Sequence, residues 1–344
     1  MQKILYVTPH LSTGGAPQYL LKKIELLNDQ YDIYVAEYND YGIFRVQKDE
    51  IITLLGKKHK TISERREELL EWIDEISPDI IHFEEMPELF NIEDEIATKI
   101  YSKDRPYKIF ETSHDSSFDP KLKKYFPDKF LFCSDNQLIK FRSIDVPACV
   151  IEYPVKKYKR KNRVEGLKYL NLDPEYKHVL NVGLFTSRKN QAEIFEYAKH
   201  LINEKIQFHF IGNQAPNFKD YWGPLMENKP DNCIVWGERS DTHNFYSCMD
   251  LFLFTSKGHH FDKETNPIVL KEAECWDIPI MLHKIDSYLD KFDNKFKFLS
   301  EDITINVLKI LNMLKIDSHK FSISSDYNGD VLNNESTKLH LSFD

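Results

Sequence analysis

Short apolar runs alternate with amphipathic stretches along the first half of the chain. Each run has the length of a buried β-strand, and the stretches between the runs repeat their apolar positions at helical spacing. Strands that alternate with helices are typical of a parallel sheet with helices on both faces. The predicted strands are Lys3–Thr8, Asp32–Glu37, Asp79–Phe83, Lys108–Thr112, Lys129–Cys133 and Ala148–Glu152. The predicted helices include Pro17–Leu27, Ser63–Ile76, Ile92–Tyr101 and Asn136–Phe141.

The same alternation continues more regularly in the second half. The predicted strands there are His178–Val182, Gln207–Ile211, Asn232–Trp236, Asp250–Phe254 and Ile278–Leu282. Helical patterns cover Asn190–Asn203 and Ile303–Leu314. The whole pattern predicts an α/β protein built from two doubly wound, Rossmann-like domains.

A chain of 344 residues is long enough for two such domains. We expect an N-terminal domain over 1–155 and a C-terminal domain over 166–315. The segment 156–165 is strongly basic, which indicates a solvated linker; the alternative is a basic edge that meets an anionic acceptor or makes peripheral membrane contact. Residues 316–344 form a polar tail, either disordered or packed back on the N-terminal domain. Because ligands of such sheets bind at the carboxyl ends of the strands, both domains should face one central cleft.

Composition narrows the class of protein further. The net charge of −9 argues against a nucleic-acid-binding protein, which usually has a basic footprint. The chain has an odd number of cysteines, five, and no C-x-x-C motif. Neither a disulfide framework nor a zinc site is therefore indicated. Free thiols fit a reducing compartment, and the N-terminus reads as a strand rather than a signal peptide. We therefore expect a cytoplasmic protein without a membrane span.

Glycines are scarce, with 11 in the chain, so their positions are informative. Gly14 and Gly15 follow the first predicted strand and precede a helix. Such a pair lets the backbone approach a diphosphate at a helix N-terminus, although a plain tight turn explains it equally well. Gly183, Gly212 and Gly237 each end a predicted strand, which suggests three loops on one sheet edge; ordinary loop punctuation is the alternative.

Two further positions suggest charged groups at strand ends. Arg188 and Lys189 stand at the start of a predicted helix, where basic side chains oppose the helix dipole unless an anion compensates them. A solvated surface pair is the alternative. His114 also follows a strand. The adjacent His259 and His260 are weak metal candidates, because no second ligand cluster accompanies them.

The segment E-T-N-P-I-V-L-K-E carries two carboxylates eight residues apart, Glu264 and Glu272. Pro267 fits the first turn of a helix, which places Glu264 in the preceding loop and Glu272 inside the helix. The backbone amides of Thr265 and Asn266 would then form an anion site at the helix N-terminus. One carboxylate on each side of that site can hold a diol, as a nucleotide-diphosphate sugar requires.

Taken together, these motifs resemble those of retaining glycosyltransferases with the GT-B fold, the group 1 or family four type. The segment V-G-L-F-T-S-R-K-N-Q is similar to the family's V-G-R-x-x-x-x-K-G, and E-T-N-P-I-V-L-K-E is similar to its E-x7-E motif. Y-S-C-M-D-L-F-L-F-T-S, T-G-G-A and S-H-D resemble three further family segments. The chain departs from the family pattern at Leu184, where arginine is usual, and at Asn190 and Asp277, where glycine is usual.

The resemblance implies roles for particular residues. Gly14, Gly15 and Gly183 would lie against the donor, with the glycine pair on its diphosphate. Arg188 and Lys189 would neutralise the leaving diphosphate. Glu264 and His114 would contact the donor sugar. The remaining donor-binding positions implied by the family are Thr265, Asn266, Pro267, Glu272 for the ribose, and Glu238 and Arg239 near the base.

The implied activity is transfer of a sugar from a nucleotide-diphosphate donor, UDP- or GDP-linked, to a hydroxyl of a glycan, lipid-linked saccharide or protein. No D-x-D motif of the kind that holds a divalent ion is present, so metal-independent chemistry with no permanently bound cofactor is expected. The rival hypotheses are a catalytically weak GT-B scaffold or binding subunit and a GT-B nucleotide-sugar epimerase. Tyr38, Tyr41, Phe44, Glu84 and Glu85 are candidates for the acceptor side, and they are equally plausible as ordinary surface and core residues. Oligomeric state is left open.

Overall fold

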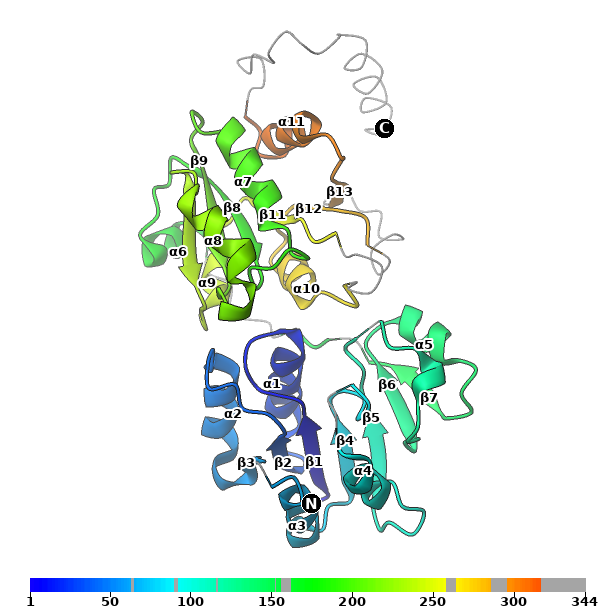
Figure 1. The fold of residues 1–344 in the computed structure, drawn as a ribbon. Helices are drawn as coiled ribbons and strands as arrows, with labels where there is room; N and C mark the ends of the chain where they lie inside the picture. Colours follow the sequence, from blue (N-terminus) through cyan, green and yellow to red (C-terminus); the bar gives the residue numbers. More distant parts are fainter. Residues whose placement is uncertain are drawn as a thin grey trace.

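Two parallel β-sheets, one in each half of the chain, form the framework of the molecule (Figure 1). The computed structural model describes residues 1–62, 65–89, 92–115, 117–151, 153–155, 162–257, 264–285 and 296–316. The basic segment 156–161, His259, His260 and the tail from 317 onward lie outside the described residues. No helix within the described ranges is long and apolar enough to cross a membrane.

The N-terminal sheet has the order β3-β2-β1-β4-β5-β6-β7, and each neighbouring pair is parallel. Its strands are β1 (Lys3–Thr8), β2 (Asp32–Glu37), β3 (His59–Thr61), β4 (Ile80–Phe83), β5 (Lys108–Glu111), β6 (Lys129–Phe132) and β7 (Ala148–Val150). Its helices are α1 (Gly15–Leu27), α2 (Val46–Leu55), α3 (Glu68–Ile76), α4 (Asp94–Ile100) and α5 (Asp135–Phe141). The strand order reverses at β1 and β4, which is the doubly wound topology.

The C-terminal sheet repeats this plan with the order β10-β9-β8-β11-β12-β13. Its strands are β8 (Lys177–Val182), β9 (Ile206–Ile211), β10 (Cys233–Gly237), β11 (Leu251–Phe254), β12 (Ile280–Leu282) and β13 (Phe296–Phe298). Its helices are α6 (Arg163–Leu170), α7 (Gln191–His200), α8 (Lys219–Glu227), α9 (Thr242–Tyr246), α10 (Ile268–Cys275) and α11 (Ile303–Met313).

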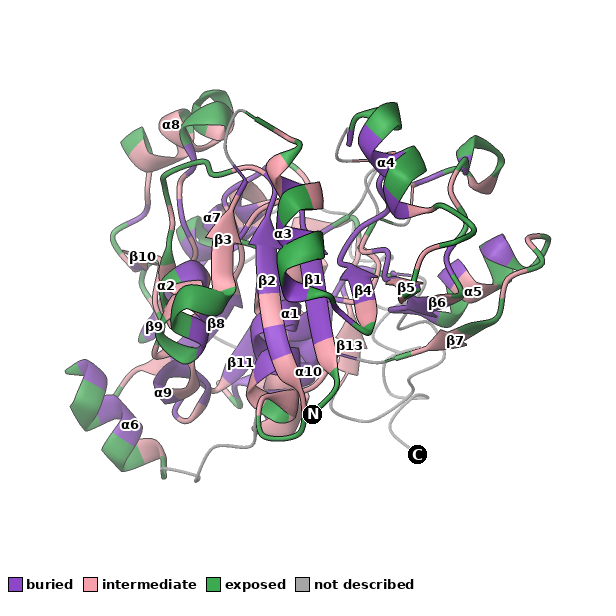
Figure 2. Ribbon diagram, turned by 90° about the horizontal axis from the view of Figure 1, so that it is seen from below, coloured by how far each residue is buried: buried purple, intermediate pink, exposed green. Residues whose placement is uncertain are grey.

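Successive side chains along a strand point to opposite faces of its sheet. Each sheet therefore has an apolar core on both faces. In β1, Leu5 packs into the cluster under α3 and α4, whereas Tyr6 packs into the one under α1 and α2. In β8, Val179 joins the cluster with α7 and α11, while Leu180 joins the one with α9 and α10. The strands are apolar on both sides because helices cover both faces. Figure 2 shows this as buried colour on β1 and β2 and exposed colour on the outer sides of α3 and α4.

The predicted strands all appear, within a residue or two of their expected ends. The periodicity misses β3 and β13, which are three residues each, and also α2, α6, α8 and α9. Within α2 only Lys48, Ile51 and Leu55 are buried, so its apolar stripe is too thin to stand out. The linker predicted over 156–165 extends too far, because its last three residues belong to α6. That helix begins at Arg163 with a capping box formed by Asn162 and Glu165.

Gly212 marks the closest approach of two strand ends in the C-terminal sheet. Its φ of +146° is rarely adopted by other residues, and a Cβ added there would stand 2.0 Å from the carbonyl oxygen of Gly183. The absence of a side chain therefore lets the loops after β8 and β9 lie against each other. Both glycines line the interdomain cleft described below.

We predict that Gly212→Ala will destabilise the protein by roughly 2–4 kcal/mol, because the methyl group meets a backbone oxygen that cannot rotate away. Thermal unfolding followed by circular dichroism measures the loss. Gly223→Ala is a matched control inside α8, where the nearest atom to the added Cβ would be the Lys219 Cγ at 3.9 Å. This control should be neutral or stabilising by up to ~1 kcal/mol. Equal stability of the two variants would contradict the explanation.

Candidate active site

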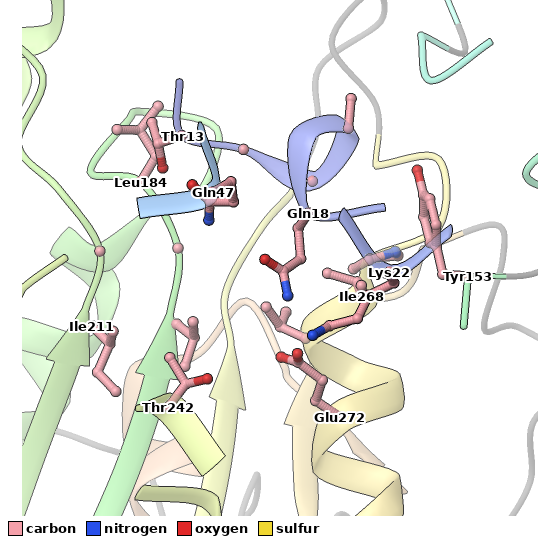
Figure 3. A pocket seen from close by; sticks show the side chains of 18 of the residues that line it. Thr13, Gln18, Lys22, Gln47, Tyr153, Leu184, Ile211, Thr242, Ile268 and Glu272 are labelled. Atoms are coloured by element: carbon pink, nitrogen blue, oxygen red, sulfur yellow. The ribbon is translucent and has the colours of Figure 1, made fainter. Parts of the chain in front are cut away.

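A cleft of about 550 Å³ opens between the two domains and is lined by both. Its size falls within the range of small-molecule sites. Each residue that the sequence singles out for donor binding or catalysis lines this one cleft, as Figure 3 shows in part. The N-terminal domain supplies Gly14, Gly15 and His114; the C-terminal domain supplies Gly183, Arg188, Lys189, Glu238, Arg239, Glu264, Thr265, Asn266, Pro267 and Glu272.

The N-terminus of α1 points its first amides at the cleft. Gly14 precedes the helix with φ +141°, and no side chain caps this end. Thr13, Gly14, Gly15 and Ala16 all line the cavity. An uncapped helix N-terminus carries unpaired N–H donors and a partial positive charge. This end of α1 is therefore suited to an anion.

Glu264 stands opposite Lys189 and Arg188 and forms ion pairs with both. Lys189 Nζ lies 2.7 Å from Glu264 Oε1, and Arg188 Nε lies 3.7 Å from the same oxygen. The Ser256 hydroxyl also donates to Oε1 at 2.6 Å. Burial opposes ionisation of Glu264, but the two cations outweigh it and hold the pKa of the carboxyl below its usual value. The anion expected near these basic residues is thus supplied by the protein itself in this structure.

The segment before α10 joins the two domains. Pro267 is the N-cap residue of α10, so the helix begins one residue later than predicted. The Thr265 hydroxyl donates to the His114 carbonyl at 2.9 Å, and the Asn266 side-chain amide donates to the Cys133 carbonyl at 2.7 Å. Ile268 packs against residues of the N-terminal domain next to these bonds. The side chains of this segment thereby fix its position, while its residues line the cleft.

Glu272 lies one helical turn after Ile268 and is held by a tyrosine. The Tyr246 hydroxyl donates to Glu272 Oε2 at 2.9 Å. Burial raises the pKa of Glu272 to about 7, although this bond and the charge of Lys22 act in the opposite direction. The carboxyl therefore changes its charge near neutral pH. Its second oxygen faces a cleft that Lys22 also lines.

The far end of the cleft is formed by the loop after β10. Burial raises the pKa of Glu238 above its usual value. Arg239 forms a two-contact ion pair with Asp241, at 2.8 and 2.7 Å, and its guanidinium lies 5.7 Å from the Trp236 ring centroid. Arg239 is thus held flat along the wall by its neighbours.

His114 is embedded in a chain of buried polar groups. Its Nδ1 atom lies 2.8 Å from the Tyr153 hydroxyl, and its Nε2 atom lies 3.4 Å from Glu84 Oε2. Glu84 is fully buried and also pairs with Lys23. Burial alone would lower the pKa of His114, but Cys133 and Glu84 together raise it to about 10. Both ring nitrogens are engaged inside the protein.

For three of the acceptor-side candidates, the alternative of an ordinary core residue holds. Tyr38, Glu84 and Glu85 are buried and do not line the cleft. The Glu85 carboxylate accepts the backbone amides of His114 and Asp115 at 2.9 and 3.1 Å, so its role is to hold the loop after β5. The sequence offered no means of separating such buried acids from exposed ones.

Other cleft residues escaped the sequence analysis. Gln18 and Lys22 project from α1, Gln47 from α2, and Tyr153 from the segment after β7 (Figure 3). Gln18 and Lys22 follow the glycine pair by one and two helical turns, which was a usable signal. Tyr153 had none, because its position depends on how the two domains meet. Within the described ranges, no group of three or more His, Cys, Asp or Glu side chains forms a metal site.

The departures from the family pattern have structural explanations. Asn190 has φ 53° and Asp277 has φ 58°, both in the left-handed region. Asparagine and aspartate are the residues that tolerate this region best after glycine, so the backbone shape is kept. Leu184 places an apolar side chain in the cleft, and the Arg188 guanidinium lines the same cleft, 3.7 Å from Glu264.

Comparison with known proteins agrees with this geometry. Residues 165–306 match the family model "Glycosyl transferases group 1". A processive diacylglycerol alpha-glucosyltransferase of Acholeplasma laidlawii is 25% identical over 180 residues, which are 52% of each chain. The match thus spans about half the length of this curated relative.

Solved structures with a similar fold cover nearly all of this chain. The Anabaena protein HepE, crystallised with UDP-glucose, superposes with a TM-score of 0.70 at 14% identity, covering all of both chains. WaaG, a glycosyltransferase involved in lipopolysaccharide biosynthesis, superposes with a TM-score of 0.63 at 14% identity over 91% of this chain and 90% of that one. The motifs, the two facing sheets and these comparisons therefore lead to one conclusion: the chain has the GT-B fold, and its residues 165–306 match the family of group 1 glycosyltransferases.

Proposed function

We propose that the protein is a retaining glycosyltransferase that moves a sugar from a nucleotide-diphosphate donor to a hydroxyl acceptor. The observation that carries the proposal is the meeting of four features in one cleft. These are the uncapped N-terminus of α1, the start of α10, the cations Arg188 and Lys189, and the carboxylates Glu264 and Glu272. Together they offer sites for a diphosphate and for diols on either side of it.

The donor would lie along the cleft with its nucleoside in the C-terminal domain. Glu272 would accept hydrogen bonds from the ribose, and the base would lie near Glu238 and Arg239. Both uracil and guanine carry a ring N–H group that can donate a hydrogen bond to a carboxylate. HepE was crystallised with UDP-glucose, and this supports a UDP-linked donor more than a GDP-linked one.

The chemistry needs charge stabilisation more than a protein base. The bond between the anomeric carbon and the diphosphate oxygen breaks, and the acceptor oxygen attacks from the same face. The acceptor proton passes to an oxygen of the departing diphosphate. Lys189, Arg188 and the α1 N-terminus would hold the charge that builds there, so the reaction is proposed to be metal-independent. The acceptor would be a glycan, a lipid-linked saccharide or a protein.

The donor and the site can be tested together. Nucleotide release is measured from UDP-, GDP-, ADP- and CMP-linked sugars with the wild type and with Glu264→Ala. We expect slow hydrolysis of one donor, lost by at least about 100-fold in the variant, because the lost carboxylate positions both the sugar and Lys189.

The rival functions give different results in the same assay. An epimerase would convert the donor sugar without releasing nucleotide. A binding subunit would leave every donor intact, and a bound nucleotide would still raise the melting temperature of the protein. Release that is equally fast in Glu264→Ala would contradict the assignment of this site.

Lys189→Met should lower kcat by about 100-fold while changing donor affinity by less than about threefold. Lys189 is already paired with Glu264 in the empty site, so its contact with the diphosphate should strengthen mainly as the bond breaks. Single-turnover rates and calorimetric affinities separate the two effects. Lys205→Met is the control, since that lysine pairs with Glu175 on the exposed surface and does not line the cleft. A loss of affinity with unchanged kcat would refute the role.

Donor binding should strengthen as the pH rises from 6 to 8. The pKa of Glu272 is about 7 because the carboxyl is buried, and only the ionised form accepts two ribose hydrogen bonds. UDP-glucose suits the measurement, since its diphosphate diester does not titrate in this range. Glu272→Gln should bind about tenfold more weakly at pH 8 and show no such rise. The same rise in both proteins would assign it to another group.

A further inference from the structure

Ser256 is a buried residue behind the wall of the cleft, and the proposed mechanism gives it no task. It follows β11, is 1% exposed and does not line the cavity. Its Oγ atom lies 2.6 Å from Glu264 Oε1 and 3.1 Å from the carbonyl oxygen of Arg188. Ser256 therefore touches both the carboxylate proposed for the sugar and the loop that carries the two cations.

The Ser256 hydroxyl has one hydrogen and two acceptors within reach. The Glu264 oxygen is the nearer of the two, and it belongs to a carboxylate that the neighbouring cations keep ionised. Hydrogen bonds to a charged acceptor are the stronger ones. The Arg188 carbonyl also accepts the backbone amide of Lys257 at 3.3 Å, so it is satisfied without the hydroxyl. The hydrogen of Ser256 is therefore donated to Glu264.

The loop that carries the cations is held by other contacts from the end of β11. The Thr255 hydroxyl lies 3.0 Å from the carbonyl oxygens of both Lys189 and Asn190. Together with the amide of Lys257 on the preceding carbonyl, it fixes the backbone of residues 188–190. None of these contacts involves Glu264. Ser256 is thus the residue of this strand end that acts on the carboxylate, whereas its neighbours act on the loop.

The partners of Glu264 differ in what a bound donor would do to them. Among the described residues, its Oε1 atom contacts Lys189 at 2.7 Å, Arg188 at 3.7 Å and Ser256 at 2.6 Å. Under the proposed function, both cations turn to the diphosphate as its bond to the sugar breaks. Ser256 is neutral and lies behind the wall, so a diphosphate does not compete for it. It is the partner that stays with the carboxylate.

We infer that Ser256 is a positioning residue, which holds the Glu264 carboxylate toward the donor sugar while Arg188 and Lys189 hold the diphosphate. The inference rests on the proposed function. Glu264 precedes α10 and belongs to no helix or strand, so side-chain contacts orient it. A carboxylate has about four acceptor positions, and Ser256 occupies one of them. The others remain for hydroxyl groups of the sugar.

The test compares nucleotides with and without the sugar. Calorimetry measures the affinities of UDP and UDP-glucose, and of GDP and GDP-glucose, for the wild type and for Ser256→Ala, and nucleotide release gives kcat. We expect the affinity for the sugar conjugate and the kcat for its hydrolysis each to fall about tenfold, because a hydrogen bond to a charged group is lost. Affinity for the free nucleotide should change by less than about threefold. Equal losses for conjugate and free nucleotide, or no loss at all, would overturn the inference.

Thr255→Val is the matched control. Thr255 is the neighbouring residue, is equally buried and does not line the cleft, and valine keeps its shape while removing the hydroxyl. That hydroxyl acts on the cation loop, which would meet the diphosphate present in both members of each pair. Any loss of affinity should therefore be the same for conjugate and free nucleotide. A loss confined to the conjugate, as large as in Ser256→Ala, would show that the course of the loop sets the preference.

A double-mutant cycle tests whether Ser256 acts through Glu264. Glu264→Gln should also lower conjugate affinity, and adding Ser256→Ala should change it by less than about threefold further. Independent, multiplying losses would separate the two residues and overturn the positioning role. If the wild type binds none of the four nucleotides, the proposed donor site fails as a whole, and this inference fails with it. That result is distinct from a wild type that binds them and a Ser256→Ala variant that does so equally well.

Discussion

The seam between the start of α10 and the N-terminal domain is the constraint on which the cleft depends. Two side-chain hydrogen bonds, from Thr265 and Asn266 to backbone carbonyls after β5 and β6, cross from one domain to the other. Ile268 adds an apolar contact at the same place. Because the bonds end on backbone atoms, they position the loops themselves. The starts of α1 and α10 both line the cleft, and Figure 1 shows these two helices on the sides of the domains that face each other.

The fold was largely predictable, because alternating apolar positions identify strands that are covered on both faces. The site was predictable to the extent that it depends on strand ends and helix starts, as for Gly14, Lys189 and Glu264. What could not be predicted depends on tertiary contacts. The pairing of Lys189 with Glu264 joins residues 75 positions apart, and Tyr153 reaches the cleft only through the interdomain contact. The short strand β13 carries too few residues for any periodicity.

The departures from the family pattern separate backbone requirements from chemical ones. Asn190 and Asp277 replace glycine but keep the left-handed backbone, so the loops around Lys189 and after α10 retain their course. Leu184 is different, because it exchanges a charged side chain for an apolar one. Arg188 lies near Glu264 and supplies a cation to the same cluster. At the two glycine positions this chain keeps a left-handed backbone, whereas near Leu184 it keeps a cation, Arg188, at another position.

In the empty cleft, Glu264 is the counter-ion of Lys189. Under the proposed function, an incoming diphosphate would not meet a bare lysine, because Lys189 is already paired with Glu264. After the sugar had left with the acceptor, the tethered carboxylate would compete with the spent nucleotide for Lys189 at a high effective concentration. A site built this way would resist inhibition by its own product.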